Sequence, residues 1–428
     1  MFKKMIRMRL ERSVQKYFKK HPEVKLVAVV GSVGKTSTKI AIGTILSQKY
    51  RVRLHEGNHN SELSAPLAIL GVEFPEDIRK LSQWLAVFGA INKRIKQPAD
   101  VDVIVQELGT DGIGQIPHFG TYLNPDIAVV TAVSAEHMEF FKTLDAVALE
   151  ELSAANFSKS ALINRDDVAG HYAADVVNAN INTYGTNVVA EYRFETSDYT
   201  FEDGFSGSFV APEWSQPTST TLHLVGDHSI RAAVAAGAVG VKLGMSAAEI
   251  SSGMEKIRPV KGRMNVIRGM NDSIIIDDTY NSSPLAVESA LRALYQLKVP
   301  QKMVVLGSMN ELGETSAAEH EALGEWCDPL QLSYVVTVGE DAARYLAPAA
   351  QKHGCHTVSF QSPLEAGAFV RKYLEKGGAV LFKGSQGGIY LEEAVKMVLH
   401  STNDEEKLVR QSKTWMLKKQ KFLDTLTK

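Results

Sequence analysis

Residues 29–46, VVGSVGKTSTKIAIGTIL, place glycines, a lysine and hydroxyl side chains between an apolar run and a helical pattern. Glycines at such a turn let backbone N–H groups point at phosphate oxygens, and the following helix adds the positive end of its dipole. Lys35 is predicted to reach the outer phosphates of a nucleotide, and the Thr36 hydroxyl to ligate magnesium. The predicted phosphate loop consists of Gly31, Ser32, Val33, Gly34, Lys35, Thr36 and Ser37.

This loop is a shortened form of the P-loop pattern, since Val29 stands where the longer pattern has its first glycine. The alternative interpretation is a tight strand–helix turn that binds nothing. Its position between a buried strand and a helix favours the nucleotide site.

Apolar runs that alternate with helical patterns must position these residues. The runs VKLVAVVGS, VDVIVQELG and DIAVVTAVS are continuous and rich in β-branched residues, which is typical of strands in a parallel sheet. Residues 171–225 change to short runs with alternating polarity, which predict antiparallel strands. A second α/β pattern follows, with the runs SIIIDDTY, QKMVVLG, SYVVTVG and GAVLFKGS. The predicted fold class is α/β, with a P-loop parallel-sheet central domain followed by a Rossmann-like C-terminal domain.

Four segments are predicted: a basic amphipathic helix at 1–22, a central ATP-binding domain at 23–260, a Rossmann-like domain at 261–400 and a basic helical tail at 401–428. In the first segment, apolar residues recur at a four-residue step, at Phe2, Ile6, Leu10, Val14 and Phe18. Two interpretations remain open for both basic helices. Each packs on its own domain, or each contacts a membrane surface or a protein partner.

The bulk composition excludes several classes of protein. A chain of 428 residues with 44% hydrophobic and 22% charged residues is globular, and its length predicts more than one domain. A net charge of −2 gives no sign of nucleic-acid binding. The chain has two cysteines, Cys327 and Cys355, which are too few for a disulfide framework or a cysteine-rich zinc site. No apolar run approaches the roughly 18 residues that span a bilayer. We therefore expect a cytoplasmic protein, with peripheral membrane association through the N-terminal helix as an open alternative.

The residues that would distinguish one P-loop protein from another lie downstream, and there the chain resembles the Mur ligase family. The resemblance covers roughly residues 25–395 and is carried by EGNHNSELSAPLAIL at 56–70, VIVQELG at 103–109, NPDIAVVTAVSAEHMEFF at 124–141, LINRDD at 162–167, GRM at 262–264, IIDDTYNSSP at 275–284, LGSMNELG at 306–313 and LFKGSQG at 381–387. Within the family, the motifs are most similar to the branch that adds D-alanyl-D-alanine in peptidoglycan synthesis. The resemblance implies a ligase that uses ATP and Mg²⁺, phosphorylates a substrate carboxylate and lets an amine attack the acyl phosphate.

The resemblance also implies roles for individual residues. Glu107 ends a buried strand, where a carboxylate is costly without a partner, and by resemblance it is a magnesium ligand. His137 resembles the histidine that holds a second magnesium ion; taken alone, it would more often be an ordinary hydrogen-bonded histidine. Arg263 resembles the arginine that reaches the ATP phosphates from the second domain, a task that suits a guanidinium.

The remaining site residues resemble nucleotide and substrate contacts. Asp278, Tyr280 and Asn281 are expected to contact the nucleotide, with the alternative that the pair Asp277 and Asp278 only caps a loop. The expected substrate contacts are Asn58 and Asn60 in the GNHN loop and Lys383 and Ser385 in the KGSQG motif.

The chain departs from the family at several positions. Most Mur ligases hold the second magnesium ion with a carbamylated lysine, whose place falls on Glu151 here, next to Glu150. A glutamate offers similar oxygen ligands on a shorter arm, and the alternative is a solvated helix face. The family asparagine that contacts the base of ATP is replaced by Ala232, although His228 of the same motif is kept. Gln386 stands where relatives often have an arginine, which bears on the choice of amine.

A further departure precedes the P-loop. Enzymes that act on UDP-linked muropeptides carry a UDP-sugar domain there, whereas only a short segment stands before the P-loop strand in this sequence. The expectation is that the acceptor differs from a UDP-muropeptide or that a partner protein supplies the missing contacts.

The residues expected to take part in catalysis are Lys35, His137, Glu151 and Arg263. Two rival functions remain. One is a folylpolyglutamate or poly-γ-glutamate type of amide ligase, and the other is a degenerate nucleotide-binding scaffold subunit. A nucleic-acid-dependent ATPase is disfavoured because the core has neither a basic stripe nor an aromatic ladder.

Overall fold

The structure is a computed structural model that describes residues 2–55, 57, 59–385 and 387–426. It divides into two compact units. The first contains residues 1–134, 140–224 and 229–258, and the second contains residues 135–139, 225–228 and 259–428. The chain passes finally into the second unit between Arg258 and Pro259, beside the boundary predicted near residue 260.

The first unit contains a nine-stranded sheet in the order β2-β3-β1-β4-β5-β6-β7-β8-β9. Neighbouring strands from β2 to β7 pair in parallel, and β7, β8 and β9 pair antiparallel, which confirms the predicted α/β class. The antiparallel prediction for residues 171–225 is confirmed for β7, β8 and β9 but is wrong for β6, which extends the parallel part of the sheet. The strands are β1 (Lys25–Val30), β2 (Val52–Leu54), β3 (Val103–Glu107), β4 (Ile127–Val130), β5 (Ser160–Asn164), β6 (Ile181–Gly185), β7 (Tyr192–Thr200), β8 (Gly204–Val210) and β9 (Thr218–Leu222).

Both faces of this sheet are covered, because successive side chains of each buried strand point to opposite faces. In β1, Leu26 and Ala28 join one apolar core, while Val27 and Val29 join the other. The helices are α1 (Phe2–Lys20), α2 (Lys35–Leu46), α3 (Ser64–Leu70), α4 (Leu81–Lys96), α5 (Gln115–Gly120), α6 (Met138–Phe141), α7 (Leu144–Asn156), α8 (Asp227–Lys242) and α9 (Ala247–Met254), with a 3₁₀ turn η1 (Gly170–Asp175). Helices α1, α3, α4, α5 and α7 contribute to the first core, and α2, α8 and α9 to the second.

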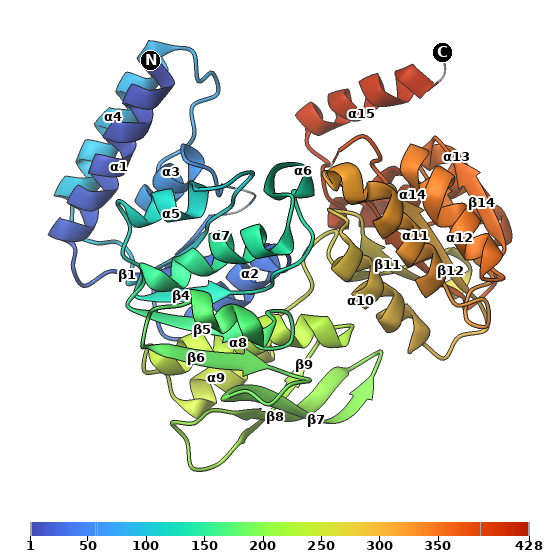
Figure 1. Cartoon of the computed structure of the whole chain (residues 1–428), viewed down its shortest axis with the longest axis horizontal. Helices are drawn as coiled ribbons and strands as arrows, with labels where there is room; N and C mark the ends of the chain where they lie inside the picture. The colour runs from blue at the N-terminus through green and yellow to red at the C-terminus, as the bar shows by residue number, and fades with distance from the viewer. Residues whose placement is uncertain (1, 56, 58, 386, 427–428) are drawn as a thin grey trace. The chain divides into compact units, whose positions relative to one another are not determined.

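Helix α1 packs on its own unit, beside α3 and α4 (Figure 1). Ile6, Leu10 and Val14 are buried as the four-residue step predicts, whereas Phe2 is exposed and Tyr17 occupies the buried position instead of Phe18. The step of four overshoots the helical repeat of 3.6, so its ends drift off the buried face. The apolar face of α1 is therefore used inside the protein, as the first of the two interpretations predicts.

The second unit contains a six-stranded sheet in the order β10-β11-β15-β12-β13-β14. Its strands pair in parallel except for β10, which is antiparallel to β11 at the edge. The strands are β10 (Asn265–Arg268), β11 (Ile274–Asp278), β12 (Lys302–Gly307), β13 (Tyr334–Val338), β14 (Thr357–Phe360) and β15 (Ala379–Lys383). Sequence patterns indicated β11, β12, β13 and β15; the two edge strands are short and only partly buried, so their patterns are weak.

The helices of this unit are α10 (Pro284–Tyr295), α11 (Ser316–Trp326), α12 (Ala347–Lys352), α13 (Pro363–Tyr373), α14 (Glu392–Lys396) and α15 (Lys413–Leu426), with the short turns η2 (Met270–Asp272), η3 (Gly313–Thr315), η4 (Ala342–Leu346) and η5 (Thr402–Lys407). Helix α15 belongs to the predicted basic tail, and its Lys419 is buried against α14. Across the described residues, no helix is both long enough and apolar enough to cross a membrane.

Candidate active site

The predicted phosphate loop connects β1 to α2. Gly31 and Gly34 adopt φ angles of 124° and 87°, which side chains with a Cβ rarely adopt. A Cβ on Gly31 would also lie 2.8 Å from the backbone nitrogen of Ala132. The loop therefore requires glycine at this position for both its conformation and its close packing against the segment after β4.

Thr131 fixes the shape of the loop from the neighbouring strand. Its hydroxyl lies 2.6 Å from the carbonyl of Val33 and 3.0 Å from that of Val30. The Ser32 backbone N–H donates to the carbonyl of Ala132 at 3.0 Å. The sequence analysis did not single out Thr131, although it directly follows the buried strand β4 (Ile127–Val130) next to the loop.

Lys35 and Thr36 begin α2, and Ser37 follows in its first turn. The Lys35 ammonium donates to the carbonyls of Gly31 at 2.5 Å and Ser32 at 3.3 Å, so it folds back over the loop. The Thr36 hydroxyl donates to Oε2 of Glu107 at 3.1 Å.

Glu107 collects polar groups at the carboxyl end of β3. Because β3 pairs in parallel with β1, and Glu107 stands opposite Val29, its side chain lies beside the loop that follows β1. Glu107 is 2% exposed, Asn60 donates to its Oε1 at 3.2 Å, and Lys39 lies 3.6 Å from its Oε2. The buried carboxylate of Glu107 therefore has three side-chain partners, which are Thr36, Asn60 and Lys39. Lys39 was not predicted as a partner.

Glu150 and Glu151 are both buried on α7 but have different partners. Glu150 accepts hydrogen bonds from the backbone N–H groups of Gly114 at 2.7 Å and Ile116 at 2.6 Å, which caps α5. Glu151 Oε2 accepts a hydrogen bond of 2.7 Å from the N–H of Gly31. The solvated-face alternative is therefore wrong for Glu151, which is 2% exposed.

His137 belongs to the second unit, whereas Glu107 and Glu151 belong to the first. It adopts a left-handed φ of 53°, and its Nδ1 lies 2.7 Å from Oε2 of Glu311. The hydrogen bond from His137 lowers the pKa of Glu311. Within the described ranges, no three His, Cys, Asp or Glu side chains are grouped so as to hold a metal ion, and the metal role of His137 stays a prediction.

Arg263, Asp278 and Tyr280 come together in the second unit. The Arg263 guanidinium lies over the Tyr280 ring, 4.4 Å from its centroid. The Tyr280 N–H donates to the carbonyl of Gly262 at 3.0 Å, and the Met264 N–H donates to Asp278 at 3.2 Å. Hydrogen bonds and the contact between Arg263 and Tyr280 thus join the turn before β10 to the loop after β11. The sequence analysis treated these two segments separately.

Asp277 has the loop-capping role that was weighed for the aspartate pair. Its Oδ1 accepts from the Thr279 N–H at 3.2 Å and from the Thr279 hydroxyl at 2.6 Å, and its Oδ2 accepts from the Gly262 N–H at 3.1 Å. Complete burial raises the pKa of Asp277 to about 7, although the hydrogen bonds from Thr279 act to lower it.

Lys383 and Asp278 are paired because they stand opposite each other on the parallel strands β15 and β11. Their charged groups lie 2.7 Å apart, and Lys383 also donates to the carbonyl of Asn281 at 2.8 Å. Ser385 is fully buried, and its hydroxyl donates to the carbonyl of Ser308. Asn58 and Gln386 lie outside the described residues.

Near Ala232, a charged network joins α8 to the end of β5. Arg231 makes two short contacts to Asp167, of 2.6 and 2.7 Å, and Asn164 donates to the same carboxylate at 2.8 Å. Asn164 and Asp167 of the LINRDD motif therefore belong to a network with Arg231 that the sequence analysis did not anticipate.

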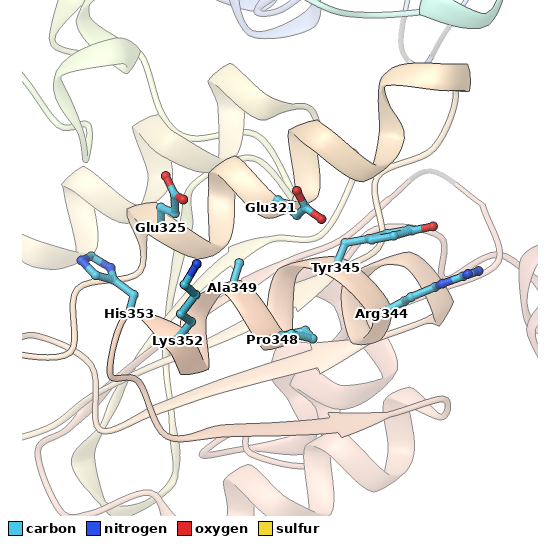
Figure 2. Close-up of a pocket in the computed structure, with 8 residues that line it drawn as sticks. All are labelled: Glu321, Glu325, Arg344, Tyr345, Pro348, Ala349, Lys352 and His353. Carbon is cyan, nitrogen blue, oxygen red and sulfur yellow. The ribbon is translucent and has the colours of Figure 1, made fainter.

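A groove of about 680 Å³ lies elsewhere on the second unit, between α11 and the stretch formed by η4 and α12 (Figure 2). Its lining consists of Glu321, Glu325, Arg344, Tyr345, Pro348, Ala349, Lys352 and His353. The charged side chains on both walls are exposed, so water screens their charges. Within the described chain, this lining includes no residue predicted to bind nucleotide or substrate.

A glycine-dependent phosphate loop with Lys35, Thr36 and Glu107, followed by a Rossmann-like unit, is the architecture of an ATP-using enzyme. Family comparisons match residues 29–240 to the Mur ligase middle domain and residues 262–386 to the Mur ligase, glutamate ligase domain. The chain belongs to the Mur ligase family. It is an ATP-dependent ligase that joins a carboxylate to an amine.

Individual relatives agree with this assignment. The chain is 27% identical over 395 residues to the UDP-N-acetylmuramoyl-tripeptide–D-alanyl-D-alanine ligase of Bacillus subtilis, covering 88% of this chain and 76% of that protein. The structure of MurF from Acinetobacter baumannii superimposes with a TM-score of 0.76 at 23% identity, covering 91% of this chain and 79% of that one. MurF ligase from Thermotoga maritima in complex with ADP gives a TM-score of 0.74 at 23% identity, covering 93% and 84%. The chain is thus closest to the MurF branch of the family.

Proposed function

We propose that this ligase acts in peptidoglycan synthesis, extending a cell-wall peptide by an amide bond between its carboxylate and an incoming amine. The observation that carries the proposal is the 27% identity over 395 residues to the UDP-N-acetylmuramoyl-tripeptide–D-alanyl-D-alanine ligase of Bacillus subtilis. The use of ATP is supported by the hydrogen bond between Thr36 and buried Glu107 beside the phosphate loop. A turn that bound nothing would gain little from a carboxylate that is 2% exposed at its side.

The proposed reaction has two steps. The substrate carboxylate oxygen attacks the γ-phosphorus of ATP, which breaks the bond to the β-phosphate oxygen and gives an acyl phosphate and ADP. The amine then attacks the acyl carbon and loses a proton, and phosphate leaves with the bonding electrons. Lys35 and the backbone N–H groups at the start of α2 hold the phosphates in both steps, and Arg263 balances charge on the transferred group.

The donor set beside the loop fits magnesium. Thr36 and Glu107 offer a hydroxyl and a carboxylate, and oxygen ligands are those that Mg²⁺ prefers. These two residues would hold the ion, which neutralises charge on the phosphate oxygens when it is bound. Lys39, at 3.6 Å from Glu107, balances the buried carboxylate.

We assign Glu151 the place of the carbamylated lysine of other family members. Its support is position: the carboxylate is buried and already accepts the N–H of Gly31 in the phosphate loop. A carboxylate there gives oxygen ligands without added CO₂. Asn60, Lys383 and Ser385 keep their predicted substrate roles, and Asn281 its nucleotide role.

The test measures phosphate release from ATP with pairs of carboxylate and amine substrates. The panel contains UDP-muramoyl tripeptide with D-alanyl-D-alanine, a folate with glutamate, and amino-acid pairs. Release with the muramoyl pair alone supports the proposal. Release with folate and glutamate alone replaces it with a folylpolyglutamate type of ligase. Nucleotide binding without release from any pair favours a scaffold subunit.

A further inference from the structure

A buried group of charges ties the C-terminal tail to α14. Glu392 is fully buried, Lys419 is 1% exposed and Arg410 is 9% exposed. The Arg410 guanidinium donates from Nε and Nη2 to the two oxygens of Glu392, at 2.8 and 2.9 Å. Lys419 lies 3.3 Å from Glu392 and 2.5 Å from Glu393. Two cations from the tail therefore neutralise two carboxylates of α14.

Arg410 also reaches the loop that follows β11. Its Nη2 donates to the carbonyl of Thr279 at 2.6 Å, and its Nη1 donates to the carbonyl of Tyr280 at 3.0 Å. One planar guanidinium thus joins the tail, α14 and this loop, with a geometry that the single ammonium of a lysine cannot reproduce. Arg410 itself adopts a φ of 56°, which is uncommon for a residue with a Cβ.

The same loop is bound to the Arg263 turn on its other side. Tyr280 donates its N–H to Gly262, and its ring supports the Arg263 guanidinium. A Cβ on Gly262 would lie 2.7 Å from Cγ1 of Val409, so the residue before Arg410 packs tightly against that turn. The tail consequently contacts both segments to which nucleotide contacts are assigned.

We propose that Arg410 is a positioning residue for the nucleotide site of the second unit. By holding the carbonyls of Thr279 and Tyr280, it fixes the loop whose Tyr280 ring orients Arg263. This proposal rests on the nucleotide roles of Arg263 and Tyr280 in the proposed function. Without Arg410 the carbonyls of Thr279 and Tyr280 lose a charged donor and the loop gains freedom, which weakens binding of the ATP phosphates.

The test compares Arg410→Lys with Lys419→Gln in the full chain. Arg410→Lys keeps a cation opposite Glu392 but cannot serve both carbonyls. Lys419→Gln removes a cation from the same buried group without touching the loop. For each variant, the dissociation constant of a non-hydrolysable ATP analogue with magnesium is measured together with the thermal unfolding midpoint.

Arg410→Lys is expected to weaken analogue binding by about tenfold, the effect of losing a charged hydrogen bond, with a fall in midpoint no larger than that of Lys419→Gln because a cation still faces Glu392. Lys419→Gln is expected to lower the midpoint and leave binding within about twofold. Equal effects of the two variants on binding, or no effect of Arg410→Lys, would overturn the positioning role.

Arg263→Ala and Tyr280→Ala separate this proposal from the one on which it rests. If either weakens analogue binding while Arg410→Lys does not, only the role of Arg410 is wrong. If neither weakens it, the assigned nucleotide site itself is wrong, and the role of Arg410 is overturned with it.

Discussion

The N–H of Gly31 in the phosphate loop donates a 2.7 Å hydrogen bond to the carboxylate of Glu151 on α7. The adjacent residue, Glu150, instead accepts the N–H groups of Gly114 and Ile116 at the start of α5. Successive residues on a helix point about 100° apart, so these two buried carboxylates serve different structures. Glu151 contacts the phosphate loop, and Glu150 contacts the start of α5.

Glu151→Gln and Glu150→Gln should therefore have different consequences. Glu151→Gln is expected to lower the turnover of ATP on the order of a hundredfold, because a carboxylate beside the transferred phosphate is lost. Glu150→Gln is expected to cost about 1–2 kcal/mol of unfolding free energy and to change turnover little, because it weakens a helix cap. Phosphate release and urea unfolding measure the two effects. Unchanged turnover in Glu151→Gln would contradict its catalytic role, and bicarbonate-dependent recovery in Glu151→Lys would support it.

Thr36→Val should abolish most magnesium-dependent turnover, by about a hundredfold or more, because it removes a proposed oxygen ligand and the partner of Glu107. Thr44→Val in the same helix is the matched control, since the Thr44 hydroxyl only bonds the carbonyl of Ile40 within α2. Steady-state phosphate release over a magnesium titration measures both variants. An equal loss of turnover in the two would show that the helix, and not the ligand, was affected.

Because of Asp277, the free energy of unfolding should fall as pH rises towards neutrality. Its pKa is about 7 in the folded protein against 3.8 for an ordinary aspartate, because burial disfavours the ionised carboxylate. A pKa that folding raises stabilises the protein at low pH, and this contribution is lost between about pH 4 and pH 7. Asp277→Asn removes the titrating group, so its stability relative to the unchanged protein should increase over that range, by an amount on the order of a few kcal/mol.

Urea unfolding at several pH values between 5 and 8 measures this difference. Asp272→Asn is the control, because the hydrogen bond from Arg268 lowers the pKa of Asp272 and its titration lies below this window. A pH-independent difference between Asp277→Asn and the unchanged protein would contradict the raised pKa.

Leu10→Ala should destabilise the first unit by about 2–5 kcal/mol, because Leu10 on α1 is fully buried in the first apolar core. Met5→Ala on the same helix should change stability by less than about 0.5 kcal/mol, since Met5 is 56% exposed. Chemical unfolding of both variants measures the difference. Similar small effects would indicate that α1 does not pack on its unit.

Local patterns determined much of the fold. Continuous β-branched runs indicated the parallel strands, and the glycines, Lys35 and Thr36 indicated the phosphate loop, because these signals arise from neighbouring residues and need no partner. Family-like motifs identified Glu107 and Arg263 as charged residues at strand ends and turns. The short edge strands β10 and β14 were missed, since edge strands are only partly buried and carry weak patterns.

Tertiary structure alone decided which charges meet. Lys39 joins Glu107, Arg410 joins Glu392, and the latter pair is 18 residues apart in sequence, with no spacing rule to connect the two residues. The family motif pointed to Glu151 and not to Glu150, but the sequence could not show the different hydrogen-bond partners of these two acidic neighbours. Their roles follow from the loops that α7 faces, and that direction is fixed only when the helix packs on the sheet. A buried carboxylate must find its donors in three dimensions, so its partner is a property of the packed chain.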